Sequence, residues 1–142
     1  MNGNVWLKRL LTVGAGLEGL AGLGLLAAPS ALVALLLGSP LEANGIVVAR
    51  LAGGGLLGLG VACWSARNTP SAPAALGVAW AFLNYNAVAC VVLAGTGAVV
   101  SARGLLVMCA AAVHGLLAVG LLTALARQRR DQHVLPSGSR AS

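Results

Sequence analysis

The sequence predicts an all-α integral membrane protein, a four-helix bundle with short loops. Hydrophobic residues make up 58% of the chain and charged residues 8%, and the mean hydropathy is +0.91. These values lie well outside the range of soluble globular domains. A membrane-spanning helix needs about 20 apolar residues, so a chain of 142 residues holds roughly four spans and leaves no room for a separate soluble domain.

Four apolar runs have the length that the hydrocarbon core requires. They predict spans at about 6–28, 44–66, 72–94 and 104–126, which together form a transmembrane domain over residues 1–126. The remaining residues, 127–142, are polar and basic. We expect them to form a cytoplasmic tail that is helical at its start and partly disordered beyond it.

The segment between the first two spans is apolar but too short to cross a membrane. It opens with Pro29 and ends at Gly38, Ser39 and Pro40, residues that interrupt helices and favour turns. We therefore expect a short kinked extension that lies near the membrane interface.

The basic residues predict the orientation, because Lys and Arg are retained on the cytoplasmic side. Four spans put both termini on one side, and that side would hold seven of the nine basic residues. We therefore expect a multi-pass protein of the cell inner membrane with cytoplasmic N and C termini. The formal charge of +6 then faces anionic lipid head groups. No nucleic-acid partner is predicted, since a base-reading surface is missing. The seven residues are Lys8, Arg9, Arg67, Arg127, Arg129, Arg130 and Arg140.

A small set of polar side chains lies inside the predicted spans. At about 1.5 Å per residue, the first, third and fourth spans each place one polar residue near the middle of the bilayer. Arg50 lies about 6 Å closer to the outer face, and its long side chain makes it the expected counter-ion of Glu18. Such groups are costly in lipid and are by default candidates for function, although a neutralised pair can also serve to fix helix register. The candidate cluster is Glu18, Arg50, Asn84, Tyr85, Asn86 and His114.

Glycines accompany the two charged residues at helical spacing. Gly14 and Gly22 share a face with Glu18, while Gly54 and Gly58 share a face with Arg50. Small faces let helices approach closely, so these four glycines are predicted to mediate helix packing. The G-x-x-x-G at 54–58 is expected to act within the bundle, with dimerisation as the alternative.

Two asparagines of the third span cannot serve the same centre. Asn84 and Asn86 are two residues apart and point to nearly opposite sides of a helix. We expect one of them to face a different neighbour or a second subunit.

The three cysteines, Cys63, Cys90 and Cys109, lie inside predicted spans without metal-ligand spacing. Small apolar packing is their expected role, and no metal site is predicted. Cys90 and Cys109 fall at a similar depth near the outer face, which leaves a disulfide between the third and fourth helices open.

A family resemblance rests on residues 22–38, "GLGLLAAPSALVALLLG", on residues 47–64, "VVARLAGGGLLGLGVACW", and on the asparagine-bearing third span. A Pro after the first helix and an Arg opening a Gly-rich second helix resemble uncharacterised small bacterial membrane proteins with four helices, loosely similar to the DoxX-like group. The resemblance extends to about Ala126. Some members of that group are associated with quinone-linked oxidoreductase complexes, so it implies an accessory membrane subunit at most. No quinone-site or haem motif carries over.

Three classes of function remain. The absence of catalytic motifs favours a non-enzymatic accessory or assembly component, whose polar cluster organises the bundle or binds a small lipophilic ligand. A proton-coupled small transporter using Glu18 is reminiscent of small multidrug-resistance exporters, but a paired Arg50 would neutralise the acid. The third class is a membrane subunit of a quinone-linked oxidoreductase using His114 or Tyr85.

The sequence assigns no catalytic residue and predicts no cofactor, while a quinone and a haem stay open. The expected partners are membrane lipids and either another membrane subunit or further copies of the chain.

Overall fold

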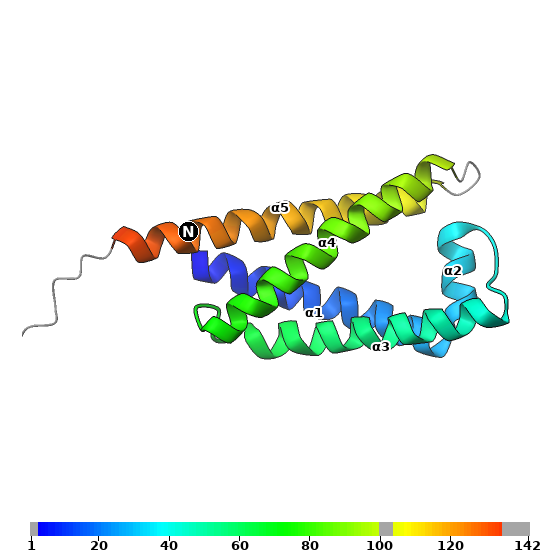
Figure 1. The fold of residues 1–142 in the computed structure, drawn as a ribbon, viewed down its shortest axis with the longest axis horizontal. Helices are drawn as coiled ribbons and strands as arrows, with labels where there is room; N and C mark the ends of the chain where they lie inside the picture. Colours follow the sequence, from blue (N-terminus) through cyan, green and yellow to red (C-terminus); the bar gives the residue numbers. More distant parts are fainter. Residues whose placement is uncertain (1–2, 100–103, 135–142) are drawn as a thin grey trace, which may run out of the picture.

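The structure is a computed structural model that describes residues 3–99 and 104–134. Its regular elements are all helices (Figure 1). Four of them are long and apolar enough to cross a membrane, which confirms the predicted all-α multi-pass bundle. The elements are α1 (Gly3–Ala27), α2 (Pro29–Leu37), α3 (Ala43–Ala66), α4 (Pro73–Val99) and α5 (Gly104–Val134).

The expected extension between the first two spans folds as the separate helix α2. Pro29 lies in its first turn, where a missing backbone N–H costs little. Gly38 ends the helix with a φ of 90° and donates its backbone N–H to the Ala34 carbonyl. In the following loop the Leu41 N–H donates to Ser30 Oγ, 3.1 Å away. These contacts fold a nine-residue helix back across the end of the bundle (Figure 1).

The four long helices form two antiparallel pairs, α1 with α3 and α4 with α5 (Figure 1). The start of α1 lies beside the C-terminal part of α5, since a Cβ added to Gly3 would be 3.1 Å from the Gln128 backbone nitrogen. We call the half of the bundle with these segments and the α3–α4 loop the terminal half. The opposite half, which α2 crosses, is the α2 half.

Glycines bring α1 and α3 into backbone contact. A Cβ on Gly22 would lie 2.7 Å from the Gly53 carbonyl oxygen, and one on Gly60 would lie 3.0 Å from the Gly19 nitrogen. Membrane helices associate through such close packing, because lipid tails are as apolar as the side chains they would displace. These contacts therefore fix the register of the α1–α3 pair.

The buried core lies almost entirely in the terminal half. At its centre the fully buried Phe82 ring packs on Gly14, where any Cβ would overlap the ring. All four long helices contribute to this core, so it joins the two helix pairs. Its residues are Leu7, Leu11, Cys63, Ala66, Ala75, Ala79, Phe82, Leu117, Leu121, Ala124 and Leu125.

A polar link closes the terminal end. The Gln128 amide nitrogen donates to Asn4 Oδ1 at 2.8 Å and to the Pro70 carbonyl at 3.1 Å. Gln128 is 4% exposed, and its two hydrogen bonds reach the start of α1 and the α3–α4 loop. One side chain thus ties three segments together.

Candidate functional site

A hydrogen bond between α4 and α5 anchors the candidate site. Asn86 is fully buried, and its Nδ2 donates to the Phe82 carbonyl at 2.8 Å. That bond orients the amide, so Asn86 Oδ1 faces His114 Nδ1, also at 2.8 Å. An amide oxygen only accepts, so Nδ1 carries the proton and Nε2 of a neutral ring is an acceptor for another group.

Glu18 of α1 joins this arrangement through Tyr85 of α4. Glu18 is 2% exposed, and the Tyr85 side chain is its hydrogen-bonding partner. The Tyr85 ring also meets the His114 ring edge-on, with centroids 5.7 Å apart and an interplanar angle of 81°. Tyr85 therefore connects the acid of α1 with the imidazole of α5. We call Glu18, Tyr85, Asn86 and His114 the polar cluster.

A cavity of about 210 Å³ opens beside the polar cluster. Three helices line it, and each contributes one polar side chain among apolar neighbours. Such a mixture of apolar wall and few convergent polar groups is typical of small-molecule sites. Its lining consists of Leu17, Glu18, Ala21, Tyr85, Ala110, Val113 and His114.

The polar cluster lies where the buried core ends. Phe82 precedes Asn86 by one turn of α4, and Leu117 follows His114 by about one turn of α5. On α1 the last core residue is Leu11, about two turns closer to the terminal half than Glu18. The close-packed core of the terminal half therefore borders the polar cluster on one side, and the α2 half borders it on the other.

The expected pairing of Glu18 with Arg50 is not present. Arg50 is exposed, and within residues 3–99 and 104–134 no ion pair joins it to Glu18. The contact of Gly22 with Gly53 and Leu57, and that of Gly60 with Ala15 and Gly19, place Arg50 level with Ala27. Arg50 therefore lies about 14 Å along the helix axis from Glu18 at 1.5 Å per residue. Depths counted from the ends of the predicted spans place those ends at the same height, whereas α3 extends past α1.

The two asparagines separate as expected, and the structure shows which one is buried. Asn86 faces His114, while Asn84 is exposed on the outside of α4. Asn84 therefore does not belong to the polar cluster, although it lies at a similar depth.

The glycine faces are only partly as predicted. Gly14 and Gly22 pack as expected, but a Cβ on Gly54 or Gly58 would meet nothing within 4 Å. The packing glycines of α3 are Gly53 and Gly60, seven residues apart. A seven-residue spacing is the signature of two helices that pack along a left-handed seam, and it was the sequence signal that could have identified them.

The cysteines add no covalent or metal link in the described residues. Cys63, Cys90 and Cys109 all have free thiols, and Cys63 is part of the buried core. In the same part of the chain no group of three His, Cys, Asp or Glu side chains could hold a metal ion.

Comparisons of the chain with protein-family models, with curated proteins and with solved structures found no match.

Proposed function

We propose that this protein is a non-enzymatic accessory membrane protein that binds a small lipophilic molecule at the polar cluster. The observation that carries the proposal is the cavity in which Glu18, Tyr85 and His114, from three different helices, meet among apolar side chains. The excess of basic residues near the terminal half supports a cytoplasmic location for that end.

The cavity's size and lining indicate the class of ligand. At about 210 Å³ it is smaller than the roughly 300 Å³ at which drug-sized pockets begin. It fits a polar head group, and the exposed Leu17 and Val113 on its rim leave the apolar remainder of the ligand in contact with lipid. A hydroxyl, a carbonyl or an amine on an apolar body has this chemistry, and quinones are one such class.

The polar groups of the cavity have hydrogen-bonding capacity to spare. A carboxylate offers about four acceptor sites, and Tyr85 is the side-chain partner of Glu18 in the described residues. His114 uses Nδ1 for Asn86 and keeps Nε2 for another group. A cluster that served only to fix helix register would have little reason to line a cavity.

The proposal is tested by extracting lipophilic compounds from the purified protein with organic solvent and identifying them by mass spectrometry and ultraviolet absorption. We expect the wild-type protein to yield about one molecule of a compound per protein chain. The amount extracted from Glu18→Gln should be at least tenfold lower. Glu42→Gln is the matched control, because Glu42 is exposed before α3. Identical extracts from wild type and Glu18→Gln would refute the proposal.

A second candidate, proton-coupled transport, is favoured by one observation. Because Arg50 does not pair with Glu18, the acid is available to bind and release a proton or a cationic substrate. Proton flux into liposomes, followed with an enclosed pH-sensitive dye, should then be lost in Glu18→Gln and kept in Glu42→Gln. Flux that survives Glu18→Gln would remove the acid from the mechanism.

A further inference from the structure

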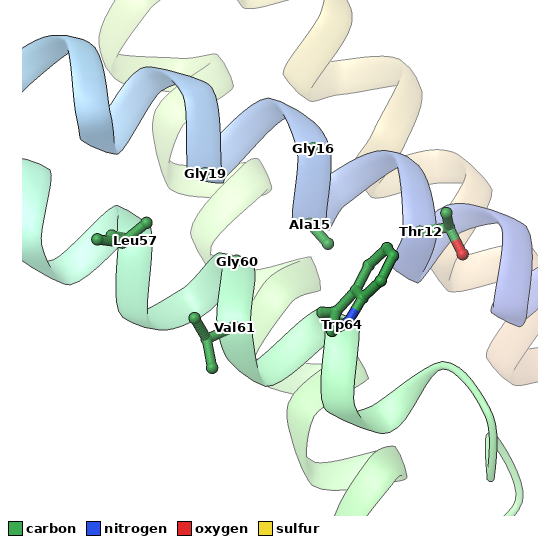
Figure 2. A pocket seen from close by; sticks show the side chains of 8 residues that line it. All are labelled: Thr12, Ala15, Gly16, Gly19, Leu57, Gly60, Val61 and Trp64. Carbon is green, nitrogen blue, oxygen red and sulfur yellow. The ribbon is translucent and has the colours of Figure 1, made fainter.

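A second hollow lies on the lipid-facing side of the α1–α3 pair, away from the polar cluster. Figure 2 shows it as a groove between the two helices. Its volume is about 360 Å³, and none of its lining residues is charged. The lining consists of Thr12, Ala15, Gly16, Gly19, Leu57, Gly60, Val61 and Trp64.

The groove exists because its floor is made of small residues. Gly60 touches the backbone of Ala15 and Gly19, whereas a Cβ on Gly16 would meet nothing within 4 Å. The space over Gly16 is therefore open to the surrounding lipid. Leu57, Val61 and Trp64 form the wall on α3 (Figure 2).

One end of the groove carries two cations, Lys8 on α1 and Arg67 directly after α3. The Arg67 guanidinium lies over the Trp64 ring, 3.2 Å from its centroid, and Arg67 Nη1 donates to the Trp64 carbonyl. On α1, the Thr12 hydroxyl donates to the Lys8 carbonyl at 2.8 Å, so the exposed Lys8 lies one turn from Thr12 on the same face. Both cations lie toward the terminal half.

The groove covers about two thirds of the depth of one leaflet of a bilayer. From Thr12 to Gly19 it extends about 10 Å at 1.5 Å per residue, and half of a hydrocarbon core is roughly 15 Å. Arg and Lys bind phosphate oxygens. Trp64 lies next to Arg67, and tryptophans are enriched at the head-group level of membranes. An apolar channel that ends at two cations is complementary to a molecule with an apolar tail and an anionic head.

We propose that this groove binds one acyl chain of an anionic phospholipid whose phosphate is held by Lys8 and Arg67. The chain lies on Gly16 and Gly19 and fills the space that larger side chains would occupy. The lipid covers the α1–α3 seam from outside and does not compete with the polar cluster.

The test is native mass spectrometry of the full-length protein in detergent, titrated with phosphatidylglycerol and, separately, with phosphatidylcholine. The wild type should bind one phosphatidylglycerol at least tenfold more tightly than phosphatidylcholine. Gly16→Leu, which fills the groove, should weaken phosphatidylglycerol binding at least tenfold, and Arg67→Gln should remove the preference for the anionic lipid.

Gly58→Leu is the matched control, because Gly58 also lies on open helix surface but outside the groove. It should bind phosphatidylglycerol as the wild type does, and circular dichroism should show equal helicity in all variants. Lipid binding by Gly16→Leu equal to that of Gly58→Leu would overturn the proposal. The proposal would also be overturned if soluble glycerophosphate, which lacks the acyl chain, bound to the wild type as tightly as phosphatidylglycerol does. A wild-type dimer that Gly16→Leu converts to monomer would overturn it as well.

Discussion

The two halves of the bundle are held together in different ways. In the terminal half, aliphatic side chains and Phe82 from all four long helices form one buried core, and Gln128 ties its end. Beyond the core, the close contacts lie within each pair, at Gly22 and Gly53 for α1 and α3 and at Gly115 and Cys90 for α4 and α5, while α4 departs from α3 to follow α5 (Figure 1).

This difference concentrates the packing that joins the two helix pairs in the terminal half. The terminal half joins the two helix pairs, and the α2 half mainly keeps the members of a pair together. The polar cluster lies between them, with packed side chains on one side and a cavity on the other. A site in this position is supported by packed side chains and borders a cavity.

The largest expected effect comes from removing the ring at the centre of the core. Phe82→Ala leaves a cavity between the helix pairs and should lower the free energy of unfolding in detergent by about 3–5 kcal/mol. Leu116→Ala is the control, because Leu116 is 74% exposed and its truncation should change that free energy by less than about 0.5 kcal/mol. Equal losses in both variants would mean that the terminal half has no special role in joining the pairs.

The next effect tests the glycine contact in the α2 half. Gly22→Val forces a side chain against the α3 backbone and should cost about 1–3 kcal/mol in the same unfolding measurement. Gly55→Val, where a Cβ meets nothing within 4 Å, should lie within about 0.5 kcal/mol of the wild type. A tolerated Gly22→Val would show that the α1–α3 register is not fixed by this contact.

A smaller effect compares the two asparagines. Asn86→Leu deprives His114 Nδ1 of its acceptor, and such interhelical hydrogen bonds contribute about 1 kcal/mol in membranes. Asn84→Leu removes an exposed amide and should leave the free energy of unfolding unchanged or slightly raised. If Asn84→Leu lowered the free energy of unfolding more than Asn86→Leu did, Asn84 and not Asn86 would lie at the helix interface.

The smallest expected effect is an interaction energy near zero. Glu18→Gln and Arg50→Gln should change the free energy of unfolding additively within about 0.5 kcal/mol, as distant residues do. A double-mutant cycle in detergent measures this value. A coupling well above that limit would restore the ion pair and, with it, a purely structural reading of Glu18.

The sequence was sufficient for the spans but not for the faces of the helices. Apolar length located the four long helices, and Pro29 and Gly38 predicted the break around α2. In a membrane, however, both the buried and the lipid-facing sides are apolar, so hydropathy does not tell which side of a helix is inside. For that reason hydropathy alone does not identify the buried glycines of α3 or the buried asparagine.

The vertical position of Arg50 shows a second limit. Its depth was inferred from where the second span begins, but helix depth in a bundle is set by the contacts between neighbours. The contact of Gly22 with Gly53 sets the position of α3 along α1. In this position Glu18 and Arg50 lie at different depths. Glu18, Tyr85 and His114 were named from sequence, whereas their convergence on one cavity depends on side-chain directions that a single sequence does not encode.

The hydrogen bond from Gln128 to Asn4 has a consequence for how the protein is made. It joins residues 124 positions apart, and the core beside it also needs the last helix. Chains are synthesised from the N terminus, so α1 and α3 can pair early through their glycines while Glu18 still faces lipid or the insertion machinery. Glu18 gains its partner Tyr85 only when α4 arrives, and α5, with His114, then completes the lining of the cavity beside the acid.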